Sequence, residues 1–376
     1  MHKLLLGMKN IFKIIFLGFL SLLYGIVIRF RNFFFDTKIF KSKEYGIPII
    51  SIGNISVGGT GKTPHTEYIA SILRKNDILI AILSRGYKRK THGFRIVNED
   101  DSYFLTGDEP LQMKQKFPDV IVAVCEKRTV GVEKLLKLYP NLSAIILDDA
   151  FQHRQITPGF SIVLNNYNSQ ITDDYLLPLG RLREPANSIN RANIIFYTKC
   201  PQNIKPIDIR ILTNNINPSP YQYLYFSTIV YNDLKNVFYE NDKIKNDDIK
   251  NKNVLAVTGI ANSKNLLEYI SKISKSVKHI KFSDHYDYRK KDFTNINKHF
   301  SQIEDDKIII VTEKDGVKFK NNKIFPEELK NYVYCIPIEV KIIPKEEDKE
   351  QFEKQIENYV RNNKTYSRIY KGANQR

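Results

Sequence analysis

An eight-residue segment at positions 56–63, Ser-Val-Gly-Gly-Thr-Gly-Lys-Thr, constrains the fold of this chain more than any other feature. It joins an apolar run, residues 47–52, to a helical pattern that begins at Thr63. A strand, a glycine-rich loop ending in Gly-Lys-Thr and a helix form the phosphate-binding loop (P-loop) of nucleoside triphosphate-binding proteins. Its glycines let backbone N–H groups surround phosphate oxygens, and the helix N-terminus adds partial positive charge. The predicted nucleotide-binding residues are Ser56, Val57, Gly58, Gly59, Thr60, Gly61, Lys62 and Thr63, with Lys62 at the terminal phosphates and Thr63 as a Mg²⁺ ligand.

Two carboxylates follow a second apolar strand, in the sequence Ala-Ile-Ile-Leu-Asp-Asp at positions 144–149. A nucleotide site needs an acid at a strand end opposite the P-loop, where it holds Mg²⁺ directly or through water. We therefore predict that one of the pair, Asp148 or Asp149, serves the metal. The structural alternative is an ordinary turn after the strand.

The N-terminus combines positive charge with a long apolar run. Residues 1–43 carry eight Lys or Arg and one acid, which is +7 of the formal net charge of +17. Residues 14–28 are uncharged, and as a helix they cover about 22 Å, less than the ~30 Å hydrocarbon core of a bilayer. Basic residues flank the run on both sides, which favours a helix at residues 1–35 that is embedded in one leaflet. A short tilted span and a buried core helix are the alternatives.

The positive charge points to anionic partners, and the anionic lipids of a membrane account for it better than nucleic acid does. We find no zinc-finger, recognition-helix or aromatic-basic signature, so no nucleic-acid partner is expected. The three cysteines are widely spaced, which gives no support for a disulfide framework or a zinc site.

Further along the chain, short runs rich in Ile, Val and Leu alternate with helical patterns, which predicts an α/β fold with a parallel sheet. Alternating residues at 225–231 and 237–240, around Asn232-Asp233, predict an antiparallel hairpin. A second strand–helix series follows it. The predicted organisation is a P-loop domain at 45–222, a β-hairpin linker at 223–252, a second, smaller α/β domain at 253–345, and a charged helix with a basic tail at 346–376.

Several other polar residues are candidates for a catalytic or ligand-binding role. Asp108, in Gly-Asp-Glu-Pro, is either a carboxylate base or an ordinary helix cap. Arg128 opens a helix, where the macrodipole opposes a cation, so an anionic ligand would explain it. Arg183 lies in a Gly/Pro-bounded basic loop and is either a phosphate ligand or solvated. His285 follows Asp284, and a histidine beside a carboxylate can transfer protons. Five other histidines, among them His65, lie in no cluster.

Taken in order, six motifs resemble the tetraacyldisaccharide 4′-kinase (lipid A 4′-kinase) family. They are the P-loop segment 51–64 and the segments 83–87, 107–110, 147–154, 180–185 and 283–286. The resemblance implies transfer of the γ-phosphate of ATP, with Mg²⁺, to the 4′-hydroxyl of a lipid A disaccharide 1-phosphate at the cytoplasmic face of the bacterial inner membrane. No obligatory protein partner is inferred. By motif position, Asp108 would be the catalytic base supported by His285, and the substrate or phosphate environment would comprise Arg128, Gln152, His153, Arg183 and Glu184.

A membrane-associated regulatory ATPase of the partitioning type is the main alternative, because such proteins share the Gly-Gly-x-Gly-Lys-Thr core. They carry a signature lysine where this chain has Val57, which argues against them. A GTP-binding protein usually needs Asn-Lys-x-Asp, and the nearest match, residues 312–315, lacks the asparagine.

Overall fold

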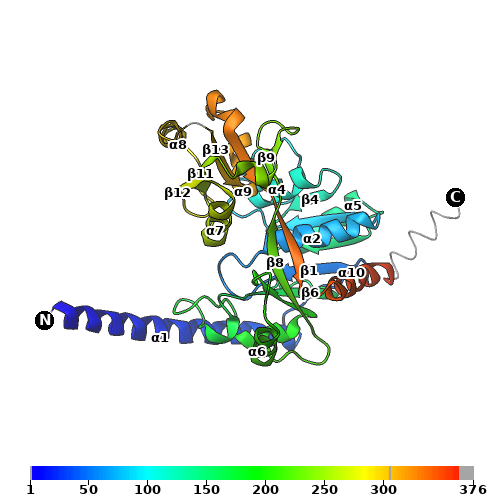
Figure 1. Cartoon of the computed structure of the whole chain (residues 1–376). Helices are drawn as coiled ribbons and strands as arrows, with labels where there is room; N and C mark the ends of the chain where they lie inside the picture. The colour runs from blue at the N-terminus through cyan, green and yellow to red at the C-terminus, as the bar shows by residue number, and fades with distance from the viewer. Residues whose placement is uncertain (1, 305, 364–376) are drawn as a thin grey trace, which may run out of the picture. The chain divides into compact units, whose positions relative to one another are not determined.

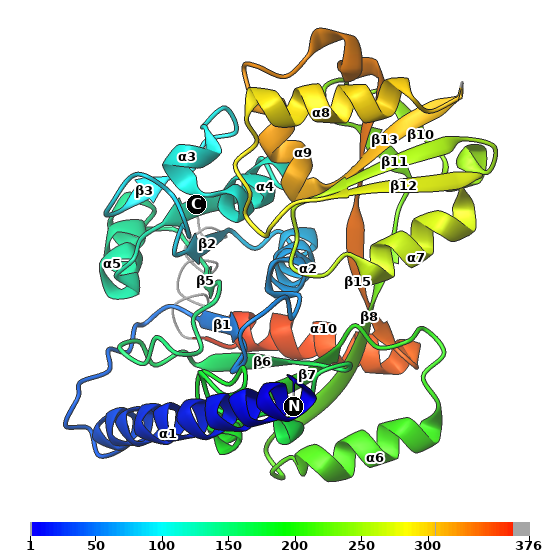
Figure 2. The same cartoon turned by 90° about the vertical axis from the view of Figure 1, so that its left-hand side faces the viewer.

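The computed structural model describes residues 2–304 and 306–363, which form two compact units (Figures 1 and 2). The first unit combines the chain up to Leu83 with Lys127–Thr228 and the chain from Val340. The second unit combines Ser84–Glu126 with Ile229–Glu339. Both units are discontinuous in sequence, whereas the boundaries predicted above are continuous and remain a prediction. The difference arises because segment 84–126, which lies between two strands of the P-loop domain in sequence, packs with the second unit.

The first unit is built on a largely parallel sheet. The strands at its centre consist of buried residues, many of them β-branched, as expected for a sheet covered on both faces. The strands follow the order β15-β8-β7-β6-β1-β5-β2, with bounds Ile338–Ile343, Tyr223–Tyr231, Ile194–Thr198, Phe160–Asn166, Ile49–Gly53, Ala144–Leu147 and Ile80–Ser84. Its helices are α2 (Lys62–Lys75), α5 (Arg128–Leu138), α6 (Pro206–Ile216) and α10 (Glu346–Arg361).

A long N-terminal helix, α1 (His2–Asp36), belongs to this unit (Figure 1). One face of its C-terminal half is hydrogen-bonded to the unit: Ser21 donates to Leu176 O at 2.8 Å and Tyr24 donates to Arg183 O at 2.8 Å. Its segment Lys13–Asp36 is long and apolar enough to cross a membrane. The helix also exposes ten large apolar side chains, each 41–65% accessible: Ile14, Ile15, Phe16, Phe19, Leu22, Leu23, Ile26, Val27, Phe30 and Phe33.

The second unit contains a six-stranded mixed sheet covered by helices on both faces (Figure 2). Alternate residues of its central strand point to opposite faces: Leu255 and Val257 pack with α8 and α9, and Val254 and Ala256 pack with α7. The strand order is β10-β9-β14-β13-β11-β12, with bounds Lys243–Ile244, Leu234–Asn236, Val333–Ile336, Lys307–Thr312, Asn253–Thr258 and Ser276–Lys281. The unit also contains α4 (Asp108–Lys116), α7 (Lys264–Ile273), α8 (Lys290–Ser301), α9 (Glu313–Lys320) and the antiparallel pair β3 (Arg95–Ile96) and β4 (Ile121–Val124).

The α/β class and the second α/β unit are confirmed, but the predicted hairpin is wrong. Strand β8 pairs in parallel with β7, whereas β9 begins at Leu234 and pairs antiparallel with β14 and β10. Residues 237–240, the second strand of the expected hairpin, form no strand, and the strand that follows β8 in sequence belongs to the other sheet. Alternating residues identify a strand, but they do not identify the strand that it pairs with.

Gly53 ends β1 immediately before the P-loop, and it has no room for a side chain. A Cβ there would lie 2.6 Å from the Phe151 Cβ and 2.8 Å from the Phe151 backbone nitrogen. We expect Gly53→Ala to lower the free energy of unfolding by about 1–3 kcal/mol, because the backbone at Phe151 must move. Denaturant unfolding measures this. At Gly59 a Cβ would meet only the Lys199 Nζ, at 3.7 Å, so Gly59→Ala is the matched control. Equal stability of the two variants would contradict the steric argument.

Candidate functional site

The P-loop occupies residues 54–61 of the first unit, between β1 and α2. Gly58 and Gly61 have φ of +110° and +91°, which side chains other than glycine rarely adopt. Gly61 is the N-cap of α2, and Lys62 and Thr63 are the first residues of the helix. Gly58 and Gly61 are thus required by backbone conformation, and the lysine and threonine follow at the positive end of the helix dipole.

Side chains from outside the loop bind three successive loop carbonyls. Lys199 donates to Gly59 O at 2.6 Å, Thr198 donates to Thr60 O at 2.8 Å, and the His65 Nδ1 donates to Gly61 O at 2.8 Å. Burial lowers the pKa of Lys199. None of these three residues was predicted from the sequence. The only signal for two of them was a Thr-Lys pair at the end of a buried strand, β7.

Lys62, Asp149 and Arg183 come together beside the loop. The Asp149 Oδ1 lies 3.4 Å from the Lys62 Nζ and 3.5 Å from Arg183 Nη1. Asp149 has φ of +46°, an uncommon conformation for a residue other than glycine, and such strain clusters at functional sites. Asp148 is buried, and its Oδ1 accepts a hydrogen bond from the Thr66 hydroxyl at 3.0 Å.

The oxygens of Thr63, Asp148 and Asp149 are hard donors of the kind that Mg²⁺ prefers, so this donor set fits the ion. Within the described residues, no group of three His, Cys, Asp or Glu side chains forms a complete metal site. This also fits Mg²⁺, which is usually held by one or two carboxylates together with water and phosphate oxygens.

The predicted substrate residues occupy different environments in the first unit. Arg128 is buried and donates to Asp148 O at 3.2 Å. Gln152 donates to Asn54 O, at the start of the loop, at 2.7 Å. His153 follows in the same turn, where its backbone N–H donates to Ala150 O. Glu184 is fully buried and accepts from Asn32 of α1 at 3.0 Å and from Arg191 at 2.8 Å.

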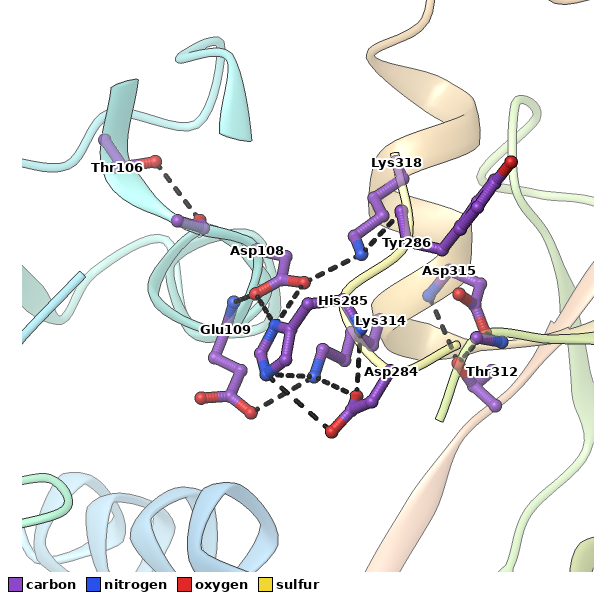
Figure 3. Close-up of polar contacts among 12 residues, drawn as sticks. Thr106, Asp108, Glu109, Asp284, His285, Tyr286, Thr312, Lys314, Asp315 and Lys318 are labelled. Atoms are coloured by element: carbon purple, nitrogen blue, oxygen red, sulfur yellow. Dashed lines mark hydrogen bonds and ion pairs between the residues drawn. The ribbon is translucent and has the colours of Figure 1, made fainter. Parts of the chain in front are cut away.

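In the second unit, Asp108 and His285 are brought together although 177 positions separate them (Figure 3). The His285 Nδ1 lies 2.9 Å from the Asp108 Oδ2 and 3.0 Å from Oδ1. Gly107 is the N-cap of α4, so Asp108 is the first helical residue and not the cap that the structural alternative required. His285 has φ of +55° and follows β12 in a tight turn.

Two lysines that were not predicted from the sequence surround this pair, both from α9. The Lys318 Nζ lies 2.9 Å from the Asp108 Oδ2, and the Lys314 Nζ lies 3.1 Å from the His285 Nε2 (Figure 3). Burial raises the pKa of Asp108, but the hydrogen bond from His285 and the charges of Lys314 and Lys318 outweigh it and hold that pKa well below its usual range. Asp108 is therefore a carboxylate at every working pH. The available signal was the spacing of the two lysines, one helical turn apart.

His65 links the P-loop to β8, and its contacts make the loop sensitive to acid. Its Nε2 lies 2.9 Å from the Ser227 hydroxyl, and burial lowers its pKa from 6.5 to about 4, since the bond to Gly61 O only partly opposes the effects of burial and of Lys199. The unfolded chain therefore binds a proton between pH 6.5 and 4 that the folded chain does not.

We expect this histidine to contribute stability that is complete above pH 6.5 and is lost as the pH falls toward 4. The loss is on the order of 3 kcal/mol. Denaturant unfolding at several pH values, compared between the parent and His65→Gln, isolates this histidine from the carboxylates that titrate nearby. A constant difference in stability between the two proteins across this window would contradict the prediction.

Comparisons with known proteins agree with the motifs. Residues 14–361 match the family model described as tetraacyldisaccharide-1-P 4′-kinase. The tetraacyldisaccharide 4′-kinases of Phocaeicola vulgatus and Bacteroides thetaiotaomicron are 45% and 44% identical; the matches cover 91% of this chain in both cases, and 94% and 92% of those proteins.

A solved structure shows the same fold. The crystal structure of LpxK from Aquifex aeolicus in complex with ATP superposes with a TM-score of 0.69 at 30% identity, covering 91% of this chain and 97% of that one. Together with the match along most of the chain, this confirms the resemblance inferred from the motifs. The chain belongs to the tetraacyldisaccharide-1-P 4′-kinase family.

Proposed function

We propose that this chain transfers the γ-phosphate of ATP to the 4′-hydroxyl of a lipid A disaccharide 1-phosphate. The observation that carries the proposal is a P-loop with left-handed glycines, followed by Lys62 and Thr63, in a member of this kinase family. ATP also accounts for the surrounding charges, because Lys62 and Arg183 lie beside the loop with a single carboxylate, Asp149, between them.

The donor side of the reaction belongs to the first unit. The residues of the motif, 56–63, bind the phosphates, and Lys62 stabilises the charge of the transferred group. Thr63, Asp148 and Asp149 hold Mg²⁺, which when bound neutralises phosphate charge and orients the group for transfer. Arg183 is 30% accessible and serves the phosphate or substrate.

The contacts of the remaining predicted substrate residues indicate different roles for them. Gln152 and His153 line the turn that holds the start of the P-loop. Glu184 is fully buried and paired with Arg191, so we assign it to positioning Arg183 rather than to direct contact with the sugar. Arg128 holds the backbone of Asp148 and adds positive charge behind the metal-binding carboxylates.

The acceptor side belongs to the second unit, where Asp108 is the base and His285 orients it. The 4′-oxygen forms a bond to the γ-phosphorus, and the bond between that phosphorus and the bridging oxygen breaks, so that ADP leaves with the electron pair. The hydroxyl proton passes to Asp108. A carboxylate with a lowered pKa suits a loose transition state, in which the hydroxyl keeps its proton until late and needs orientation more than early deprotonation.

The decisive measurement is incubation of the protein with labelled ATP and lipid A disaccharide 1-phosphate, followed by separation of the lipids. A labelled 4′-phosphorylated lipid supports the proposal. Hydrolysis of ATP with no labelled lipid would overturn it and would favour the regulatory ATPase instead.

We expect Asp108→Asn to keep ATP binding and to lose about 10²-fold or more in turnover, because the variant cannot accept the hydroxyl proton. Steady-state assay of the phosphorylated lipid measures the loss, and nucleotide titration checks the fold of the donor side. Asp100→Asn, an exposed carboxylate of the same unit, is the matched control. Near-normal turnover of Asp108→Asn would remove Asp108 from the role of base.

We further propose that α1 holds the protein at the cytoplasmic face of the bacterial inner membrane, where an acylated substrate and ATP are both available. The ten exposed apolar side chains of α1 lie on a helix that is also hydrogen-bonded to the first unit. Arg29, an exposed residue of the same helix, can contact the head groups of anionic lipids.

Replacing Phe16, Phe19 and Leu23 together with serine is expected to abolish flotation with vesicles that contain anionic lipid, while the docked face of α1 stays intact. Each large apolar side chain contributes roughly 1.5–3 kcal/mol when it leaves water. Exposed apolar residues outside α1 give a matched control, Leu79→Ser/Leu138→Ser/Ile324→Ser. Unchanged flotation of the α1 variant would contradict the anchor.

A further inference from the structure

Two lysines of α9, Lys314 and Lys318, have no role in the function proposed above, yet Lys318 contacts the base directly and Lys314 contacts the histidine beside it. We propose that they are positioning residues: Lys318 fixes the carboxylate of Asp108, and Lys314 fixes the orientation and tautomer of the His285 ring. This inference rests on the proposed function, since it concerns the same Asp108–His285 pair.

Lys318 is the clearer case because it is almost completely buried. Its side chain is 1% accessible, and its Nζ lies 2.9 Å from the Asp108 Oδ2 and donates to Tyr286 O at 3.0 Å. A buried ammonium is costly unless it is paired and hydrogen-bonded. Asp108 is the charge partner of Lys318, so each of the two charges offsets the free-energy cost of burying the other.

Lys314 determines which nitrogen of His285 carries the proton. Its Nζ lies 3.1 Å from the His285 Nε2, 3.1 Å from the Asp284 Oδ1 and 3.4 Å from the Glu109 Oε1 (Figure 3). Burial lowers the pKa of Lys314, but the carboxylates of Glu109, Asp108 and Asp284 have the larger, opposite effect and hold this pKa above its usual value. Lys314 is therefore an ammonium, which has no lone pair and can only donate.

The tautomer follows from this donor. Because Lys314 donates to Nε2, that nitrogen is the acceptor, and the ring proton lies on Nδ1. The Nδ1–H then donates to the Asp108 carboxylate, which matches the contacts of 2.9 and 3.0 Å. A chain of donors runs from Lys314 through His285 to Asp108, and it leaves Asp108 with an aligned and fully ionised carboxylate.

Helix α9 is built to hold these two lysines in place. The Thr312 hydroxyl accepts from the Asp315 N–H at 3.1 Å and caps the helix, and the buried Asp315 carboxylate accepts from Gly259 N at 2.9 Å and from the Tyr288 hydroxyl at 2.9 Å. Lysine in the first turn is opposed by the helix dipole, so helix stability does not explain Lys314. Its contacts with His285, Asp284 and Glu109 do.

The groups that face the pair come from three elements and their adjoining turns. Helix α9 supplies Lys314 and Lys318, α4 supplies Glu109, and the turn after β12 supplies Asp284. The Tyr87 ring packs edge-on against the His285 ring with centroids 5.0 Å apart, and the charge of Asp108 acts on Tyr103, whose pKa is raised chiefly by burial.

Lys314 is tested first, in the full-length protein labelled with ¹⁵N-histidine. In the parent, we expect the His285 ring to show one tautomer, with Nδ1 protonated. In Lys314→Met, we expect its nitrogen signals to show exchange between tautomers, and kcat to fall on the order of tenfold with the KM for ATP unchanged. Lys320→Met, on the same helix but 43% accessible and paired with Glu240, should match the parent in both measurements. Unchanged His285 signals in Lys314→Met would overturn the role of Lys314.

Lys318 is tested by the pH profile of kcat/KM. Asp108 must be ionised to act, and in the parent it is ionised at every working pH, so it sets no acid limb there. Lys318→Met removes one of the charges that lower the pKa of Asp108, so an acid limb should enter the working range in this variant. A pH profile identical to that of the parent would overturn the role of Lys318. If Lys318→Met does not fold, the double variant Lys318→Met/Asp108→Asn should fold, because the unpaired buried carboxylate is then absent. Failure of the double variant as well would overturn the pairing.

These outcomes are separable from failure of the proposed function. The histidine signals report the ring in the absence of any substrate, so they test positioning even if no phosphorylated lipid is formed. Conversely, full activity of Asp108→Asn would remove the base and leave the tautomer result intact.

Discussion

The first unit depends on a P-loop that is held by hydrogen bonds from side chains outside it to three of its backbone carbonyls. The side chains of Lys199, Thr198 and His65 bind the carbonyls of Gly59, Thr60 and Gly61 in turn. Buried carbonyls must find donors, and an isolated glycine-rich loop would supply few. Because β7 and α2 supply them, the loop conformation is set before a nucleotide arrives, which reduces the ordering cost of binding.

The same loop is connected to the N-terminal helix through one short segment. Arg183 N donates to Ile55 O at 2.7 Å and Val57 N donates to Arg181 O at 2.8 Å, so this segment runs beside the P-loop. On its other side, Tyr24 donates to Arg183 O and Asn32 donates to the buried Glu184. Docking of α1 and the position of Arg183 are thus parts of one hydrogen-bonded arrangement.

Local pattern was enough to predict the P-loop, the strand ending at Asp148-Asp149 and the α/β class, because each is encoded by neighbouring residues. The hairpin was wrong because alternation within one segment says nothing about which strand lies beside it, and because residues 237–240, its expected second strand, form no strand. Lys314, Lys318 and His65 were missed for a related reason. Their partners, Asp108, His285 and Ser227, lie 29 to 210 positions away, and only the fold brings them together.

Asp149 and Asp108 show how one residue type is suited to two tasks by its surroundings. Asp149 is 34% accessible, and its cationic partners lie at 3.4 and 3.5 Å, distances that leave a carboxylate oxygen open to a metal ion. Asp108 is 6% accessible and is bound at 2.9 Å by both Lys318 and His285. Tight contacts orient a carboxylate and keep it ionised, but they also weaken it as a base. That compromise suits phosphoryl transfer, where alignment of the attacking oxygen matters more than its early deprotonation.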